Sequence, residues 1–349
     1  MNRDNESVDY SILLLTYNQA QVVKAALRPL ISQVGAKGEL VICDDASSDE
    51  TLEVIDTELA AHYCEKNIRV VRRPRNLGLV KNFSDGALLC KGEIIIVAAG
   101  DDISAPDRAQ KIIEEFRSDA ETMLVFSNWT PISPHGKNAT VKLRKKQKFS
   151  YNLVSPSRSL HAQAPIIGAC AAYRRCLFEI FGPLAECRII EDQAMWIRGL
   201  ILGNLSLIEE PLVKYRLRDM TKYAEQDKPY FEKGKNRLLA HSSRSLKRYE
   251  TCKRQWLADI ETAKLKGYLK DEEYLSLVDA ANYTFEKSRF SRYCLYRAPL
   301  RLWYGSFKRL LPRCRTSHRS RRMFILVKLR LSRSRQTKKL HRTGAILKR

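Results

Sequence analysis

The strongest constraint on the fold is a regular alternation, early in the chain, of short apolar segments and longer segments with helical spacing. Segments rich in Val, Ile and Leu predict four strands, at residues 8–16, 39–43, 68–71 and 93–97. Between them, apolar residues recur every three or four positions, which is the period of an amphipathic helix. The alternation predicts an α/β fold whose mostly parallel central sheet is covered by helices on both faces.

Local signals add detail to this outline. Ser47-Ser-Asp-Glu50 has the form of a capping box, which predicts that a helix starts there. Pro106 stands where the first turn of a later helix is predicted. Pro, Ser and Lys are frequent over residues 126–165, which predicts loops and hairpins. Farther along, the pattern predicts a helix that opens at Glu191 and a pair of strands over residues 205–215.

The net charge of +23 is concentrated in one segment. Residues 287–349, which we call the basic arm, contain 21 Lys and Arg and no Asp or Glu, so the remainder holds 41 basic against 39 acidic residues. Such an arm favours an anionic partner, either lipid headgroups or nucleic acid. We therefore predict three parts, with an α/β domain at residues 1–221, a helical extension at 222–286 and the basic arm at 287–349.

Composition excludes several classes of protein. A hydrophobic fraction of 44% and a charged fraction of 29% are typical of a globular chain. No apolar stretch reaches the roughly 18 residues of a transmembrane helix. The polar start of the sequence lacks the pattern of a secretory signal. Nine Cys without a Cys-x-x-Cys pair predict reduced thiols in a cytosolic protein rather than disulfides or a zinc site.

Three pairs of acidic residues follow predicted strands or open a predicted helix. They are Asp44-Asp45, Asp101-Asp102 and Glu191-Asp192. Ligands of an open α/β sheet bind at the carboxyl ends of its strands, so these pairs indicate a binding site there. Asp is also favoured in solvated turns and at helix starts, and that alternative stays open for each pair taken singly.

Five segments, in order, resemble the signature of the family 2 inverting glycosyltransferases. They are Ser11–Asn18, Val41–Asp49, Asn76–Gly78, Gly92–Asp102 and Glu191–Arg198. The resemblance extends over residues 8–218 and implies a GT-A fold, a sandwich that binds a nucleotide sugar. It implies inverting transfer of a sugar, with UDP as the expected nucleotide, to a sugar hydroxyl on a lipid-linked or polysaccharide acceptor. The expected context is surface polysaccharide synthesis, such as that of an O-antigen or capsule.

The resemblance also implies which residues bind the nucleotide. Asp45, with Asp44 beside it, matches the acidic residue that accepts a hydrogen bond from the base, and the uracil imide N–H is a suitable donor. Tyr17 matches an aromatic residue against the base, although packing at a strand end explains it equally well. Nucleotide contacts, to base, ribose or phosphate, are also expected from Thr16, Asn18, Asn76, Lys81 and Asp101.

The same resemblance implies a metal site. Asp101 and Asp102 match the Asp-x-Asp region, where oxygen ligands hold Mg²⁺ or Mn²⁺ against the diphosphate. Ala99 stands where the first Asp of that pattern often lies, so phosphate and water ligands are expected to carry more of the metal affinity. Arg218 stands where many relatives have His, and an Arg can pair with a phosphate but cannot ligate a cation. An ordinary surface Arg is the alternative at that position.

Asp192 matches the general base of the family, the carboxylate that takes the proton from the acceptor hydroxyl. Glu191 would orient this base. Trp196 lies one helical turn beyond Asp192, where it is expected to fill the core rather than to support a sugar ring.

Within the basic arm, apolar residues recur at helical spacing among Lys and Arg, as in an interfacial membrane helix. They are Leu300, Trp303, Phe307 and Leu310. This pattern predicts a cytoplasmic protein bound peripherally to the inner face of the cytoplasmic membrane. A solvated tail is one alternative. The rival function is nucleic-acid binding by the basic arm on a nucleotide-binding fold, although the sequence contains no nucleic-acid-binding motif.

Overall fold

The structure is a computed structural model, which describes residues 8–62, 67–134, 148–149, 167–185, 191–217 and 234–282. The chain divides into two compact units, Met1–Arg289 and Phe290–Arg349. The basic arm and Arg218 lie outside the described residues, and the domain limits at 221 and 286 stay predictions. No helix in the described ranges is both long and apolar enough to cross a membrane.

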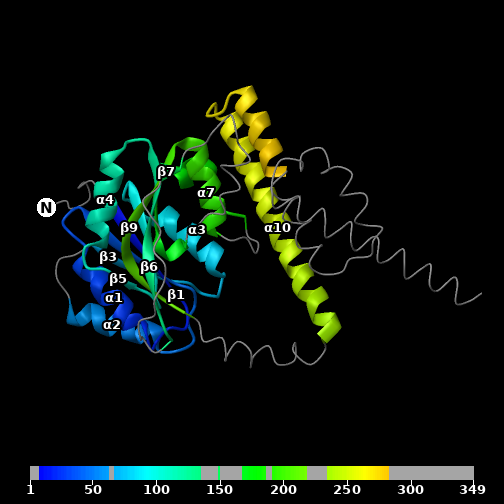
Figure 1. Cartoon of the computed structure of the whole chain (residues 1–349). Helices are drawn as coiled ribbons and strands as arrows, with labels where there is room; N and C mark the ends of the chain where they lie inside the picture. The colour runs from blue at the N-terminus through cyan, green and yellow to red at the C-terminus, as the bar shows by residue number, and fades with distance from the viewer. Residues whose placement is uncertain are drawn as a thin grey trace, which may run out of the picture. The chain divides into compact units, whose positions relative to one another are not determined.

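The first part of the chain confirms the predicted alternation of strands and helices (Figure 1). Strand β1 pairs in parallel with both β2 and β4, and β3 extends the parallel sheet beyond β2. The elements are β1 (Tyr10–Thr16), α1 (Val23–Ser32), β2 (Gly38–Asp44), α2 (Thr51–Ala61), β3 (Ile68–Arg72), α3 (Leu79–Leu89) and β4 (Ile94–Ala99).

The second part extends the same sheet, in which the strand order is β3-β2-β1-β4-β8-β6-β9-β5, with β7 paired to β9. Strand β8 runs antiparallel to both β4 and β6. The elements are β5 (Ile103–Ser104), α4 (Arg108–Ser118), β6 (Thr122–Ile132), β7 (Lys148–Phe149), η1 (Gly168–Cys170), β8 (Ala171–Arg174), α6 (Cys176–Phe181), α7 (Glu191–Leu202), β9 (Asn204–Arg216) and α10 (Gly234–Leu265), and residues 271–282 are also helical.

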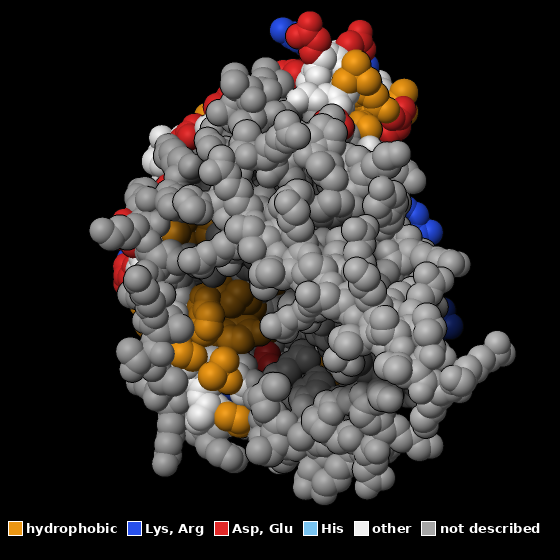
Figure 2. All heavy atoms as spheres, turned by 45° about the vertical axis from the view of Figure 1, so that its right-hand side comes forward, with side chains coloured by type: hydrophobic (Ala, Val, Ile, Leu, Met, Phe, Trp, Pro, Cys, Tyr) orange, Lys and Arg blue, Asp and Glu red, His pale blue; other side chains and the backbone are white. Residues whose placement is uncertain are grey.

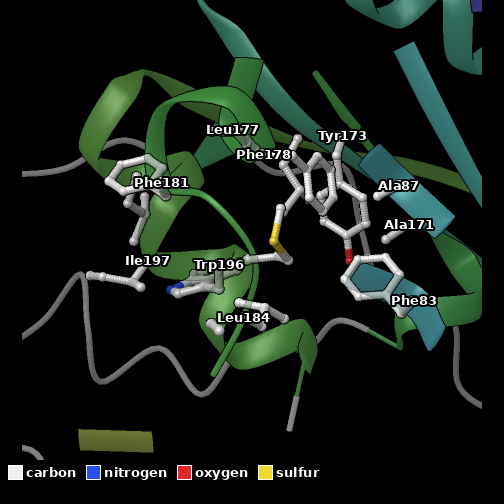
Figure 3. Close-up of a cluster of buried hydrophobic side chains, with 14 of the residues drawn as sticks. Phe83, Ala87, Ala171, Tyr173, Leu177, Phe178, Phe181, Leu184, Trp196 and Ile197 are labelled. Carbon is white, nitrogen blue, oxygen red and sulfur yellow. The ribbon is translucent and has the colours of Figure 1, made fainter. Parts of the chain in front are cut away.

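Alternate residues of the strands face two separate hydrophobic clusters, because successive side chains of a strand point to opposite faces. Ile12 and Leu14 of β1 pack with α1, α2 and α4. Leu13 and Leu15 pack on the other face with α3, α6, α7 and α10. Figure 3 shows part of this second cluster. The predicted α/β architecture, with helices on both faces of a mostly parallel sheet, is therefore confirmed.

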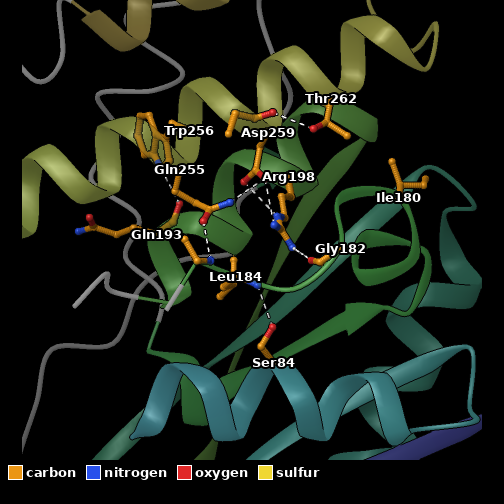
Figure 4. Close-up of polar contacts among 12 residues, drawn as sticks. Ser84, Ile180, Gly182, Leu184, Gln193, Arg198, Gln255, Trp256, Asp259 and Thr262 are labelled. Carbon is orange, nitrogen blue, oxygen red and sulfur yellow. Dashed lines mark hydrogen bonds and ion pairs between the residues drawn. The ribbon is translucent and has the colours of Figure 1, made fainter. Parts of the chain in front are cut away.

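Helix α10 is joined to α7 by a buried ion pair between Arg198 and Asp259, whose side chains are 0% and 2% exposed (Figure 4). Two guanidinium nitrogens of Arg198 donate to the two Asp259 oxygens, at 3.0 and 2.9 Å. A third donates to the carbonyl of Gly182 at 2.9 Å. The Gln255 amide nitrogen donates to Asp259, and its amide oxygen accepts from the backbone N–H of Ala185. These contacts make α10 part of the same compact unit as the sheet.

The predicted capping box does not form. The Ser47 hydroxyl instead donates to Asp44 Oδ1 at 2.6 Å, within the turn that follows β2. Helix α2 begins later, at Thr51, whose backbone N–H donates to Asp49 Oδ1 at 3.1 Å. Pro106 also lies earlier than predicted, ahead of the Asp107 N-cap of α4.

Two predictions for the middle of the chain were wrong. Residues 126–132, expected to be loop, form the second half of β6. The expected strand pair is one strand, β9, parallel to β6 over most of its length. The register between them shifts around Asn128, which lies opposite Pro211. An irregularity of this kind lets a strand contain a proline. The prediction was wrong because it took polar and proline-rich sequence as a sign of loops.

Candidate functional site

A cavity of about 470 Å³ opens at the carboxyl ends of β1 and β4. Residues at the start of α3 line one side of it, and the first turn of α7 lines another. On the face drawn in Figure 2, hydrophobic and acidic side chains are visible inside a hollow of the surface. The predicted site residues that line the cavity are Thr16, Tyr17, Asp45, Asn76, Asp101, Asp102, Glu191 and Asp192.

The loop after β1 is held in a conformation that few residues adopt. Asn18 has a φ of 51°, in the left-handed region, and its side-chain oxygen accepts from the backbone N–H of Ser48 at 2.8 Å. A Cβ at Gly100 would come within 2.3 Å of Gln19 Oε1 and 2.8 Å of Thr16 Cγ2, so the loop after β4 packs closely against this loop at a glycine. The tight packing of these loops fixes one wall of the cavity.

Asp44 and Asp45 have different surroundings although they are neighbours. Asp44 is fully buried, and its carboxylate accepts from the hydroxyl of Thr16 at 2.8 Å and from Ser47. Asp45 lines the cavity and accepts from the backbone N–H groups of Leu77 and Gly78, at 2.7 and 2.8 Å. Asp44 therefore stabilises a turn, while Asp45 links that turn to the loop before α3.

Of the predicted residues that the structure describes, Asn18, Asp44 and Lys81 do not line the cavity. Lys81 forms an ion pair with Asp85, one turn along α3, at 3.3 Å. Tyr17, in contrast, is 46% exposed at the cavity, which leaves its ring accessible to a ligand.

Asp101 and Asp102 form an acidic pair directly after β4. The Asp102 side chain is buried, its Oδ1 accepts from the backbone N–H of Arg216 at 2.7 Å, and its Oδ2 is buried without a partner. Burial, and then the nearby charge of Asp101, raise the pKa of Asp102 to about 7. The guanidinium of Arg216 also donates to the carbonyl of Asp101 at 2.9 Å, which holds the loop after β4 in place.

Glu191 and Asp192 form the second acidic pair, at the start of α7. Asp192 Oδ1 is shielded from solvent and has no hydrogen-bond partner. Burial, and then the charge of Glu191, raise the pKa of Asp192 to about 7. A carboxyl group with such a pKa can exchange a proton near neutral pH, which suits a general base.

Two residues of the site were missed by the sequence reasoning. Arg216 lies two positions before the predicted Arg218, and only the return of β9 beside β5 brings it to Asp101 and Asp102. Tyr173 lines the cavity from β8, which is a short strand with no motif to mark it. Neither residue had a local signal, because long-range strand pairing brings Arg216 to Asp101 and Asp102 and brings Tyr173 to the cavity.

The acidic pair after β4 fits a divalent cation. Its ligand atoms are carboxylate oxygens, which Mg²⁺ and Mn²⁺ prefer, and the buried Oδ2 of Asp102 has no protein partner. No three His, Cys, Asp or Glu side chains gather as a metal site in the described residues. That phosphate and water ligands carry more of the metal affinity, because Ala99 stands where an Asp often lies, stays a prediction.

Comparison with known proteins identifies the domain. Residues 11–181 match the family described as glycosyl transferase family 2. The chain is 26% identical over 212 residues to an uncharacterized glycosyltransferase, alr2836, of Nostoc sp., with 59% of this chain and 64% of that protein covered. It is 24% identical over 210 residues to the amylovoran biosynthesis glycosyltransferase AmsE of Erwinia amylovora, with 59% and 76% covered.

A solved structure, Staphylococcus aureus TarS residues 1–349 in complex with UDP-GlcNAc, superposes with a TM-score of 0.57 at 17% sequence identity. The alignment covers 86% of this chain and 79% of that one. At this identity the similarity establishes the fold. The relatives give no support to the nucleic-acid alternative.

Proposed function

The chain is a family 2 glycosyltransferase with a GT-A fold, and from this premise we propose that it transfers a sugar from a UDP-sugar, with inversion, to a sugar hydroxyl. The expected context is surface polysaccharide synthesis. AmsE, named for amylovoran biosynthesis, supports that context, and TarS, solved with UDP-GlcNAc, supports the choice of nucleotide.

One observation carries this proposal: a single cavity is lined by the loops after β1, β2 and β4 and by the first turn of α7. The base would lie near Asp45 and Tyr17, where a carboxylate can accept the uracil imide hydrogen and a ring can stack. Asn76 and Thr16 would contact the ribose. The diphosphate would lie beside Asp101 and Asp102.

Asp101 and Asp102 would hold Mg²⁺ or Mn²⁺, which supplies positive charge to the leaving nucleotide diphosphate. Arg218 would add a further phosphate contact, and Lys81 would do so after releasing Asp85. Asp192 would take the proton of the acceptor hydroxyl, with Glu191 orienting it. The shielded Oδ1 of Asp192 and its raised pKa support this role, since both favour proton uptake near neutral pH.

The first test is a ligand screen of the purified chain by thermal shift and calorimetry. UDP is expected to stabilise the protein more than GDP, CMP or dTDP, and to do so more strongly with Mn²⁺. Asp45→Asn should weaken this binding. Because Asp45 also holds the loop at Leu77, Tyr17→Ala serves as a second variant, whose exposed ring can be removed at little cost to stability.

A preference for another nucleotide would contradict the assignment of UDP. The absence of any nucleotide shift, together with tight salt-sensitive binding of RNA, would favour the nucleic-acid alternative.

We also propose that the basic arm binds an anionic membrane surface, where a lipid-linked acceptor would be available. The support is its charge, 21 Lys and Arg with no acidic residue. The full chain should float with vesicles that contain anionic phosphatidylglycerol and not with neutral phosphatidylcholine vesicles. Equal binding to both kinds, or undiminished binding after deletion of residues 287–349, would contradict this proposal.

A further inference from the structure

Tyr173 of β8 is the cavity residue whose hydroxyl the fold does not use. The side chain is 0% exposed, yet its hydroxyl has no hydrogen-bond partner. Buried hydroxyls are normally paired, because an unpaired one loses its hydrogen bonds to water without replacement. The residue lines the cavity, so a ligand bound there can supply the partner that the hydroxyl lacks.

The ring of Tyr173 is held by packing alone. It makes edge-to-face contacts with Phe83 of α3 and Phe178 of α6, with ring centroids 6.0 and 6.1 Å apart (Figure 3). A phenylalanine would make the same ring contacts. The hydroxyl therefore adds nothing to the packing of this cluster.

Two other oxygens at the cavity are also buried without a hydrogen-bond partner. They are Oδ2 of Asp102 and Oδ1 of Asp192, and both residues line the same cavity. In the proposed function, Asp102 faces the diphosphate and Asp192 the acceptor hydroxyl. Tyr173 supplies a third unpaired polar atom, and the sequence reasoning assigned it no role.

The strand order places Tyr173 relative to the donor. Asp45 follows β2, Thr16 ends β1 and Asp102 follows β4, and the next strand in the sheet is β8. A donor that binds its base near β2 and its diphosphate near β4 therefore directs its sugar towards β8. Tyr173 also lies within electrostatic range of Glu191 and Asp192, the residues beside which the sugar would react.

We propose that Tyr173 is a specificity-determining contact, whose hydroxyl forms a hydrogen bond with a hydroxyl of the transferred sugar. This inference rests on the proposed function and adds to it a residue that discriminates between donor sugars. A phenol both donates and accepts hydrogen bonds, as a sugar hydroxyl does. Burial raises the pKa of Tyr173 well above its usual value, so the group keeps its proton at neutral pH.

The test is the affinity of wild type and Tyr173→Phe for UDP, UDP-glucose, UDP-galactose and UDP-N-acetylglucosamine, measured by calorimetry with Mn²⁺. The variant is expected to lose about tenfold in affinity for the UDP-sugar that wild type prefers, the effect of one hydrogen bond. Its affinity for UDP should not change. Its thermal midpoint should stay the same or rise, since the lost hydroxyl has no partner in the fold.

Tyr10→Phe is the matched control. The Tyr10 hydroxyl donates to the carbonyl of Gln33 at 2.7 Å and accepts from the N–H of Gly35 at 2.9 Å, and Tyr10 does not line the cavity. Removing this paired hydroxyl should lower the thermal midpoint and leave all four affinities unchanged. The two substitutions are chemically identical and should have opposite effects.

Each of the following results would overturn the role of Tyr173. Equal losses for UDP and for the UDP-sugars would show that the substitution disturbs the whole cavity. Unchanged affinities would show that no sugar hydroxyl contacts the phenol. Unchanged affinities with a shifted pH profile of donor turnover would identify Asp192 as its partner. If wild type binds none of the four compounds, the assignment of UDP fails first, and the inference fails with it.

Discussion

Helix α7 carries two ionisable side chains with buried polar atoms that differ in their hydrogen bonding. At its start, Asp192 has an oxygen that is shielded from solvent without a partner. Farther along the same helix, Arg198 is completely buried, and its guanidinium donates to both oxygens of Asp259 and to the carbonyl of Gly182. Helix α7 thus carries one carboxylate oxygen that has no hydrogen-bond partner in the fold, on Asp192, and one guanidinium that the fold pairs fully, on Arg198.

This difference distinguishes a residue of the candidate site, Asp192, from a residue that holds two helices together, Arg198. The Arg198–Asp259 pair joins α7 to α10, and both charged groups have their hydrogen-bond partners within the fold. An unpaired buried oxygen costs stability, and burial together with the charge of Glu191 moves the pKa of Asp192 towards neutral, where a proton can be exchanged. Asp44 and Asp102 repeat the contrast, since Asp44 is satisfied by its own turn while Asp102 Oδ2 is not.

The largest predicted effect is that of Asp192→Asn. Turnover of the UDP-sugar with an acceptor glycan should fall by about 10² to 10⁴-fold, because an amide cannot take up the proton of the acceptor hydroxyl. Initial rates for the two proteins, at saturating donor, measure the loss. Turnover within a factor of two of wild type would remove Asp192 from the role of base.

The same variant tests the cost of the unpaired acid. The pKa of Asp192 is about 7 in the folded protein and near 3.8 when unfolded. The folded state therefore binds more protons in that window, so this group lowers the free energy of unfolding as pH rises from about 4 to 7. Asp192→Asn should be relatively more stable at pH 8 than at pH 5, as thermal unfolding at both values would show. Wild-type turnover should increase through pH 7.

The next largest predicted effect is that of breaking the buried ion pair between Arg198 and Asp259. Arg198→Met leaves Asp259 buried without its cation, and the free energy of unfolding should fall by about 3 to 5 kcal/mol. Urea unfolding measures this loss. The double variant Arg198→Met, Asp259→Leu should recover most of it, because it leaves no buried charge unpaired. A double variant as unstable as the single one would mean that the pair is needed for more than charge balance.

The smallest predicted effect concerns the contact between α10 and the first turn of α7. The Trp256 indole N–H of α10 donates to the carbonyl of Gln193, the residue after Asp192, at 3.1 Å (Figure 4). Trp256→Phe keeps a ring there but removes the donor, so kcat should fall about 2- to 10-fold while the KM for the donor stays constant.

Tyr274→Phe is the control for that measurement. It removes an exposed hydrogen bond from Tyr274 to Glu261 of α10, at 2.7 Å, and should leave kcat unchanged. A change in KM alone for Trp256→Phe would mean that α10 affects donor binding rather than the position of the base.

Much of the site could be predicted from short segments of sequence. The strand ends and a helix start pointed to the loops of Asp45, Asp101 and Asp192, the resemblance to the family implied their roles, and the structure brings all three to one cavity. Asn18 and Asp44 satisfied the same local rule, yet their side chains hold turns together. A local pattern identifies the loops that surround a site, but it does not tell which polar side chains the fold itself uses.

The sequence by itself determined the α/β sheet, its two helical layers and the edge of the sheet at which the cavity lies, because periodicity and strand ends are local properties. Only the tertiary structure decided which polar groups remain unsatisfied. Arg216 reaches Asp102 across 114 positions of sequence, Arg198 meets Asp259 across 61, and Tyr173 lines the cavity through the pairing of β8 with β4. These contacts depend on strand order and on helix packing, which no single segment encodes.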